Sequence, residues 1–236
     1  MISKIKKSLN KIIYPNKYSS EAYVRYLRKN GAEIGNNTTF IYPKNTVVDE
    51  QKLEFIKIGH NCCITSGVVI LAHDWSYSVV ARVYNDAPGK QSITSIGDNV
   101  FIGMNSIILM GSNIEDNVII GAGSVVSGRI EKNSVYAGNP ARKICSLDEY
   151  YKKLQNSFDE SALLTIDVLE KAYGKTPSLE KLGLYASLFV DKTPQNMEKY
   201  FSNSSIPFAI SKMNKKYDSY EELRIDIEKK RKGKNV

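Results

Sequence analysis

The chain has 236 residues, of which 42% are hydrophobic and 10% aromatic, and its formal net charge is +8. This composition excludes an intrinsically disordered chain, and no segment approaches the roughly 18 apolar residues that a membrane-spanning helix needs. The basic start also lacks the apolar stretch of a secretory signal peptide, so the sequence predicts a cytoplasmic protein.

Basic residues concentrate at the two ends of the chain, at Lys4, Lys6, Lys7 and Lys11 and in the segment 229–234. Elsewhere they are scattered, which favours solvated ends over a nucleic-acid surface. A basic surface also suits anionic ligands such as a CoA phosphate or an acidic glycan, and it permits peripheral association with an anionic membrane through the termini.

A helix is predicted close to the N-terminus. Ser19 and Ser20 are suitable N-cap residues, the stretch "EAYVRYLRKN" follows them, and Gly31 ends the pattern. We interpret residues 1–31 as a helical cap on the domain that follows.

From Ile34 onward the sequence repeats with a period of six. A helical period of 3.6 residues would smear such a repeat around the helix, whereas a short strand followed by a tight turn matches it. Three hexamers close one triangular coil of a parallel β-helix, and coils stack about 4.8 Å apart. The spacing of 24 between the first two members is counted as four hexamers; the aliphatic positions are Ile34, Ile58, Ile64, Ile70, Ile96, Ile102, Ile108, Ile114, Ile120 and Val126.

The repeat is interrupted by the stretch "LAHDWSYSVVARVYNDAPGKQSIT". From Ile70 to Ile96 is 26 residues, two more than four sixes, so an insertion leaves the coil here. We therefore expect residues 32–144 to form the β-helix, with a loop insertion over 74–93. The first side chains to leave the coil are a histidine and an aspartate, His73 and Asp74.

After Ile144 the hexamers stop and helix signals replace them. Ser146 with Glu149 forms a capping box, Thr193-Pro194 is a helix start, and Ser219 with Glu222 forms a second box. Residues 145–236 are therefore predicted to be a C-terminal helical region, which serves as a cap or binds an acceptor or a partner.

The hexamers with "IGAGSVV" and "YAGNPARKI" resemble the hexapeptide-repeat acyltransferase superfamily, and the resemblance covers Ile34 to Ile144. It implies a mainly β fold, a left-handed parallel β-helix. It also implies a homotrimer with acetyl-CoA, the acyl donor, held in clefts between subunits. No metal is expected: the carbonic anhydrases of this superfamily need three histidines and this chain has two.

The resemblance makes His73 the general base, since the family's catalytic histidine lies on a loop that leaves the β-helix. A base must take the proton of the acceptor hydroxyl as it attacks the thioester, and imidazole, with an ordinary pKa of about 6.5, is suited to this. A carboxylate or carbonyl on the other ring nitrogen would fix the tautomer. Asp74 and Asp86 are both candidates, while His60 is expected to be structural.

The resemblance also assigns the donor site. A backbone N–H near Gly103 or Met104 is the expected oxyanion donor, because Met104 stands where the family's sugar acetyltransferases commonly have a serine. Small residues are needed where the pantetheine passes, and basic residues suit the nucleotide phosphates; the residues that match are Gly121, Ala122, Ser127, Arg142 and Lys143. Coil packing and a solvated basic pair are the alternative roles.

The inserted loop is expected to bind the acceptor. Its Trp75, Tyr77, Arg82 and Tyr84 could pack on a sugar ring and hydrogen-bond its hydroxyls or a carboxylate. Burial of the same side chains at a trimer interface is the alternative.

Four functions compete on this sequence. The first is O-acetylation of a sugar of a bacterial surface or capsular polysaccharide, or of its precursor, by direct attack on the thioester. The second is acetylation of an antibiotic, as in the chloramphenicol and streptogramin enzymes, and the third is N-acetylation of an amino-sugar nucleotide. The fourth, a non-enzymatic β-helix, would not need His73.

Overall fold

The computed structural model describes residues 11–233, and the chain divides into two compact units after Tyr151. Each unit has a hydrophobic core of its own. Lys4, Lys6, Lys7 and Lys234 of the basic ends lie outside the described residues. Within 11–233, no helix is long and apolar enough to cross a membrane.

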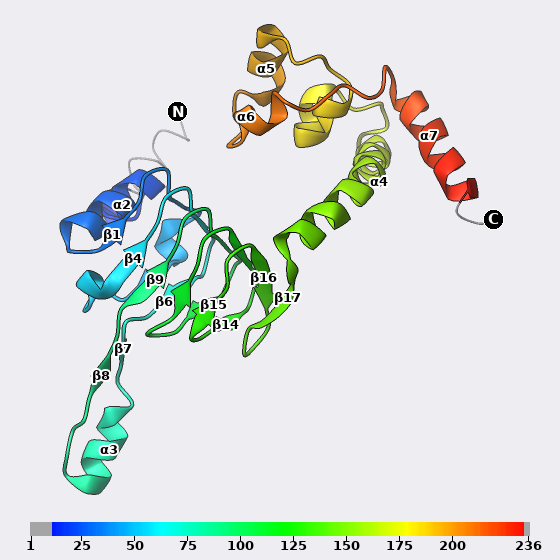
Figure 1. Cartoon of the computed structure of the whole chain (residues 1–236). Helices are drawn as coiled ribbons and strands as arrows, with labels where there is room; N and C mark the ends of the chain where they lie inside the picture. The colour runs from blue at the N-terminus through cyan, green and yellow to red at the C-terminus, as the bar shows by residue number, and fades with distance from the viewer. Residues whose placement is uncertain (1–10, 234–236) are drawn as a thin grey trace. The chain divides into compact units, whose positions relative to one another are not determined.

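The first unit is a triangular coil whose three sides are parallel sheets (Figure 1). One sheet, called here the first face, contains β1 (Glu33–Ile34), β4 (Ile56–Ile58), β9 (Thr94–Ile96), β12 (Asn113–Ile114) and β15 (Arg129–Ile130). The second face contains β2 (Thr39–Phe40), β5 (Cys63–Ile64), β10 (Phe101–Ile102), β13 (Val118–Ile120), β16 (Ser134–Ala137) and β17 (Arg142–Ser146). The third face contains β3 (Val47–Val48), β6 (Val69–Ile70), β11 (Ile107–Ile108) and β14 (Val125–Val126).

The six-residue period corresponds to the interior of this coil. Each strand is two to five residues long, and its aliphatic member points inward, so that Ile64, Ile102 and Ile120 stack in one column and Ile70 and Ile108 in another. All ten aliphatic positions of the repeat are buried. Burying a full column of this kind requires several coils, because a single coil leaves both of its edges open.

Asparagine turns the corner between the first and second faces in every coil. Asn37, Asn61, Asn99, Asn117 and Asn133 have φ between 54° and 59°, in the left-handed region that asparagine tolerates better than other side chains. Their side-chain amides also hydrogen-bond from coil to coil, for example Asn99 to Asn117 at 2.8 Å. The turn residues between the hexamers therefore join the coils as well as reverse the chain.

The 24 residues between Ile34 and Ile58 do not form the four regular hexamers that the sequence predicts. β1 pairs directly with β4, and Ile34 is the partner of Ile58, so these 24 residues make one coil and not more. A regular coil has three hexamers, and two short 3-10 turns, η1 (Pro43–Asn45) and η2 (Leu53–Phe55), enlarge its corners. The spacing that matched four sixes is therefore one coil with two insertions.

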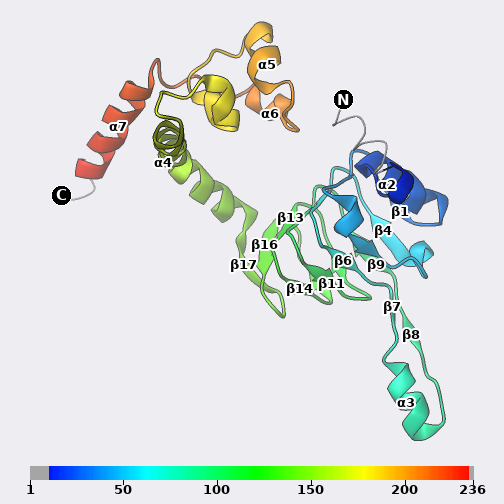
Figure 2. The ribbon, with the colours of Figure 1, turned by 180° about the vertical axis from the view of Figure 1, so that it is seen from behind.

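The predicted insertion leaves the coil at the corner between the third and first faces. One hexamer would take the chain from Ile70 to the next inward position, so 26 − 6 = 20 residues are extra. They form an arm, in which β7 (His73–Asp74) and β8 (Lys90–Gln91) pair antiparallel and carry the helix α3 (Tyr77–Tyr84) (Figures 1 and 2). No residue of α3 is buried.

The predicted N-terminal helix is confirmed as α2 (Ser20–Lys29). Ser19 is its N-cap and accepts a hydrogen bond from the Ala22 N–H at 3.2 Å. Ser20 has a different task, because its Oγ accepts the Phe40 N–H at 2.9 Å and ties the helix to β2. Tyr23 and Leu27 are fully buried, so the helix covers the apolar end of the coil.

The second unit is helical, as the sequence predicts. Its elements are α4 (Leu147–Tyr173), which begins in the first unit, then η3 (Leu179–Leu188), α5 (Pro194–Phe201), α6 (Pro207–Ile210) and α7 (Tyr220–Gly233). The box at α4 is complete, with Ser146 N–H donating to Glu149 Oε2 at 2.7 Å and Glu149 N–H donating to Ser146 Oγ at 3.2 Å. An ion network around Asp159 joins α4 to α7 through Lys230 and to the segment before α7 through Lys216.

Candidate active site

His73 and Asp49 form a hydrogen-bonded pair at the base of the arm. The imidazole Nδ1 contacts Asp49 Oδ2, and the same oxygen accepts the backbone N–H groups of Ala72 at 2.9 Å and of His73 at 3.1 Å. The Asp49 side chain is 3% exposed and the His73 side chain 16%. Because a carboxylate can only accept here, the Nδ1 atom carries the proton and Nε2 is left as the basic nitrogen.

The stacking of coils produces this pair. β3 pairs with β6 so that Val48 lies beside Ile70, and the next residues, Asp49 and Leu71, leave their strands at the same corner. The Asp49 N–H bonds to Ile70 O at 2.9 Å, which fixes the carboxylate above the departing arm. A buried carboxylate is costly unless it is hydrogen-bonded, and four donors meet that need here, since the Gln51 N–H also donates to Asp49 Oδ1 at 3.3 Å.

The structure therefore places neither of the predicted aspartates against His73. Asp74 turns outward and caps the start of the arm, accepting Ser76 N–H at 2.7 Å and Ser76 Oγ–H at 2.8 Å, which hold the pKa of Asp74 below its usual range. Asp86 is exposed beyond α3 and makes no hydrogen bond within the described part of the chain. The partner is Asp49, which lies outside the inserted loop that contains Asp74 and Asp86.

A pocket of about 450 Å³ opens beside His73. Trp75 packs edge-on against the imidazole, with 5.9 Å between ring centroids, and Tyr77 stacks on Trp75 at 5.6 Å. The pocket also contains groups that the sequence did not single out; they are Gln51, Lys52, Lys90 and Gln91. His73 Nε2 is buried and makes no hydrogen bond to the described residues, so it is the ring nitrogen left without a partner.

Arg82 and Tyr84, the other two predicted acceptor residues, do not line this pocket. Arg82 donates to Ser78 O at 3.1 Å along α3, and Tyr84 is 74% exposed at the end of that helix. The structure thus brings together Trp75 and Tyr77 with His73 and leaves Arg82 and Tyr84 farther out on the arm.

The predicted donor-site residues fall on two different edges of the coil. Ser127 lies in the turn after β14, at the corner from which the arm departs two coils earlier in the stack. Gly103, Met104, Gly121 and Ala122 lie at the corner between the second and third faces, on the far side of the third face from His73. Within one chain, the predicted oxyanion donors at Gly103 and Met104 are therefore not on the edge that carries the base.

Packing between neighbouring coils also explains the glycines at the corner between the second and third faces. A Cβ on Gly103 would lie 2.4 Å from the Ala122 backbone nitrogen, and one on Gly121 would lie 2.8 Å from the Ala137 Cβ. Met104 and Ala122 are exposed there, and Met104 O accepts the Gly123 N–H at 2.8 Å. Coil stacking thus requires both glycines whether or not a ligand passes them.

Arg142 and Lys143 lie on β17 at the end of the coil and are exposed. Lys143 donates to Glu131 at 2.8 Å, which raises the pKa of the ammonium group. The Arg142 guanidinium donates only to the Ala141 carbonyl among the described residues, at 3.2 Å, so it is the freer of the two cations.

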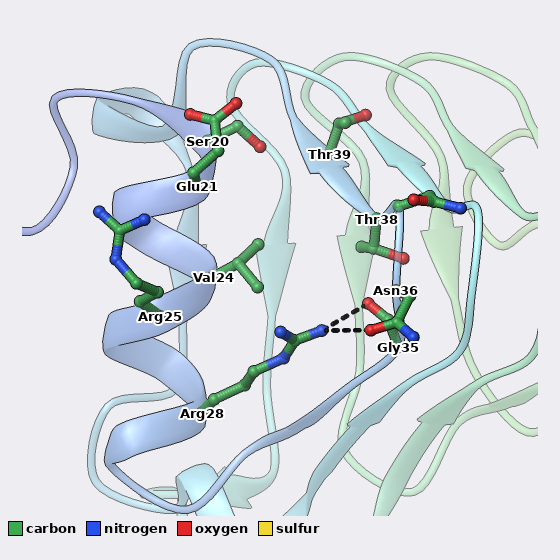
Figure 3. A pocket seen from close by; sticks show the side chains of 10 residues that line it. Ser20, Glu21, Val24, Arg25, Arg28, Gly35, Asn36, Thr38 and Thr39 are labelled. Carbon is green, nitrogen blue, oxygen red and sulfur yellow. Dashed lines mark hydrogen bonds between the residues drawn. The ribbon is translucent and has the colours of Figure 1, made fainter.

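A larger pocket of about 620 Å³ lies between α2 and the first coil (Figure 3). Arg28 reaches across it and donates to Ile34 O and Gly35 O, both at 2.9 Å, while Arg25 points to the other side of the helix. The Arg28 guanidinium is thus used to hold α2 on the first coil. We assign the chemistry to the smaller pocket, which contains the histidine.

His60 and Cys62 have structural roles in the coil. His60 Nδ1 accepts the Asn36 N–H at 2.9 Å between two coil corners. Cys62 is buried, and burial raises the pKa of its thiol, which disfavours the thiolate that an acyl-cysteine would require.

Comparison with known proteins gives the family. The model "Hexapeptide repeat of succinyl-transferase" matches residues 93–127. Protein CapG of Staphylococcus aureus is 40% identical over 134 residues, which are 56% of this chain and 76% of that protein. The chain belongs to the hexapeptide-repeat acyltransferase superfamily. This confirms the predicted left-handed parallel β-helix and the enzyme class, an acyl-CoA-dependent acyltransferase.

Other members of the superfamily also match part of the chain. The putative lipopolysaccharide biosynthesis O-acetyl transferase WbbJ of Escherichia coli is 35% identical over 42% of this chain and 55% of that protein. The bifunctional protein GlmU of Campylobacter jejuni is 35% identical, and the chain spans only 26% of it. The solved maltose O-acetyltransferase from Clostridium difficile 630 is 32% identical, covers 61% of this chain and 83% of its own, and has a TM-score of 0.41.

Proposed function

We propose that this superfamily member is an acetyl-CoA-dependent O-acetyltransferase that acts on a sugar hydroxyl of a bacterial surface polysaccharide or of its precursor. The observation that carries the proposal is the buried Asp49–His73 pair, which leaves Nε2 as the base beside a pocket lined by aromatic and amide groups. The name of WbbJ, a putative lipopolysaccharide biosynthesis O-acetyl transferase, supports a hydroxyl as the acceptor.

The Asp49–His73 pair suits direct transfer. As the acceptor oxygen attacks the thioester carbonyl carbon, its proton passes to His73 Nε2, and the negative charge of Asp49 stabilises the imidazolium that forms. When the tetrahedral intermediate collapses, the carbon–sulfur bond breaks and the imidazolium returns its proton to the CoA thiolate. The products are the acetyl ester and CoA, and the enzyme needs no acylated side chain.

The outer faces of the coil support a homotrimer. The first face is polar outside, with Glu33, Lys57, Ser95, Asn113 and Arg129 along its strands. The outward residues of the third face are all apolar, Val47, Val69, Ile107 and Val125, and those of the second face include Cys63, Phe101 and Ile119. Two adjoining apolar sheet faces are the surface that a ring of like subunits would bury.

Such a ring also accounts for the split donor site. His73 and Ser127 lie at one edge of the third face, and Met104 and Ala122 lie at the other edge. If the third faces of the subunits are turned toward the axis of the ring, the edge with His73 from one chain can meet the edge with Met104 and Ala122 from another. The acyl donor would then bind between two subunits, with Arg142 available to the nucleotide phosphates.

The proposal is tested by following CoA thiol release from acetyl-CoA with separate acceptors. The panel comprises capsular oligosaccharides, free sugars, a uridine-diphosphate amino sugar and chloramphenicol. We expect turnover with saccharide hydroxyls and an ester in the product. Turnover confined to chloramphenicol, or an amide product from the amino sugar, would replace the proposed acceptor class, and no turnover with any acceptor would reject acetyl transfer.

A further inference from the structure

The pocket beside His73 has a charge that the transfer chemistry does not require. Two lysines line it together with one exposed carboxylate, so Lys52, Lys90 and Asp74 sum to 2 − 1 = +1. The Asp49 carboxylate is buried beside the imidazole and is occupied by its own four donors. The surface that an acceptor meets is therefore cationic.

Both lysines are held next to the Asp49–His73 pair by backbone hydrogen bonding. Lys90 is the cross-strand partner of Asp74, and Gln91 is the partner of His73 in the β7–β8 ladder. The Lys52 N–H donates to Asp49 O at 3.1 Å, so the turn that carries the acid also carries this lysine. The two ammonium groups thus come from separate elements that meet at the pocket.

Neither lysine has an ion-pair partner among the described residues. Two exposed lysines of the same unit do, since Lys57 pairs with Glu33 and Lys143 with Glu131, both at 2.8 Å, whereas Lys29 and Lys44 have no such partner there either. At the pocket, the nearby Asp74 carboxylate is instead occupied by the N–H and hydroxyl of Ser76. Two such ammonium groups beside a reactive base offer charge-assisted hydrogen bonds to an anion.

The remaining lining gives a place for the ring of the acceptor. Trp75 is 57% exposed and stacks with Tyr77 at an interplanar angle of 24°, which forms an open aromatic surface. The C–H face of a sugar packs well on such a surface, and the amides of Gln51 and Gln91 can bond to hydroxyls.

We propose that the acceptor is an anionic saccharide, whose negative group binds Lys52 and Lys90 while its ring packs on Trp75 and Tyr77 and one hydroxyl faces His73. This inference rests on the proposed function and narrows its substrate class. The anion is a carboxylate on the sugar or a phosphate of an activated precursor, since both present oxygens to an ammonium group in the same way.

Binding without turnover separates these sources. The full chain is titrated by ligand-observed NMR with trigalacturonate and its methyl ester, and with galactose 1-phosphate and methyl galactoside. We expect the anionic member of at least one pair to bind about tenfold more tightly, and that difference to disappear in the Lys52→Gln/Lys90→Gln double variant. The pair that shows it identifies the anion, and Lys29→Gln, on the exposed end of α2, should leave it intact.

Equal binding within both pairs, or a difference that survives the double variant, would overturn the inference. In steady-state kinetics the double variant should raise the KM for an anionic acceptor about tenfold and leave the KM for acetyl-CoA unchanged. A rise in the acetyl-CoA KM alone would assign the lysines to the donor and overturn the inference. Efficient turnover of a neutral saccharide that is unchanged in the double variant would also overturn the inference, but it would leave the proposed function in place. No turnover of any saccharide would reject the proposed function itself.

Discussion

Asp49 and His73 lie 24 residues apart in the sequence, yet one carboxylate oxygen of Asp49 accepts hydrogen bonds from both the ring Nδ1–H and the backbone N–H of His73. The bond to the backbone fixes where the arm leaves the coil, and the bond to the ring fixes the tautomer. The same acid thus holds the loop and prepares the base.

The role of Asp49 predicts a kinetic difference between two aspartates. Asp49→Asn should lower kcat about 10²- to 10⁴-fold with a smaller effect on the acceptor KM, because an amide cannot stabilise the imidazolium and permits the wrong tautomer. Asp74→Asn should change kcat only a few-fold, since its carboxylate bonds to Ser76. Steady-state kinetics on both variants, with circular dichroism to check folding, measures the two losses in kcat. Equal losses would show that Asp49 has no role in catalysis beyond that of Asp74.

The apolar outer faces predict a specific assembly. The wild-type chain should have three times the chain mass by light scattering. Phe101→Glu, on the second face, should yield monomers with little activity, because it places a charge in the buried interface. Asn113→Glu is the matched control on the polar first face and should remain trimeric. A monomeric wild-type protein with full activity would contradict the assembly.

The close stacking of coil corners predicts where an added methyl group is tolerated. In Gly59→Ala the new Cβ would lie 2.2 Å from Asp98 Oδ1 and 2.7 Å from the Gly97 carbonyl carbon, so the coils must move apart. We expect a loss of about 1–3 kcal/mol in the free energy of unfolding. Gly89→Ala, on the arm, meets Tyr77 at an ordinary 3.6 Å and should change stability by less than about 0.5 kcal/mol. Urea denaturation followed by far-ultraviolet circular dichroism compares the two, and similar midpoints would contradict the stacking.

The ion network of the second unit predicts a loss of order in acid. Burial raises the pKa of Asp159, but hydrogen bonds from Lys216, Lys230 and Tyr217 lower it by more, so it lies below the ordinary 3.8. A lowered pKa means that the unfolded chain binds the proton more readily, so this stabilisation is present above about pH 4 and is lost as pH falls through the lowered value.

Hydrogen exchange measures this effect on the full chain. After correction for intrinsic rates, α7 should be less protected at pH 3 than at pH 6, because Asp159 joins α7 to α4 through Lys230. In Asp159→Asn the change in α7 protection between the two pH values should be clearly smaller. An unchanged pH response in that variant would show that Asp159 does not stabilise α7.

The sequence predicts those features that depend on local repetition. Inward positions such as Ile108 and Ile120 could be assigned because each hexamer repeats the same local geometry, and the helix starts at Ser146 and Thr193 because a helix cap is a contact between near neighbours. The helix α3 was not foreseen, since "YSVVARVY" is rich in β-branched residues that form helices poorly.

The acid could not be found in the same way. Asp49 meets His73 only because parallel coils stack, and the two short insertions at η1 and η2 had concealed how many residues the first coil contains. Once Ile34 is known to lie beside Ile58, the 24-residue offset that joins them is the same offset that joins Asp49 to His73. The lysines of the pocket, Lys52 and Lys90, follow no sequence pattern and come together only through the turn and the ladder that hold them.

The most direct test of the catalytic assignment compares the two histidines of the chain in one assay. Acetyl transfer from acetyl-CoA to a saccharide acceptor is measured for wild type, His73→Ala and His60→Ala. We expect His73→Ala to lose at least about 10²-fold in kcat with its fold intact, because the acceptor hydroxyl has lost its base, and His60→Ala to stay within a few-fold of wild type. Wild-type turnover by His73→Ala would contradict the account.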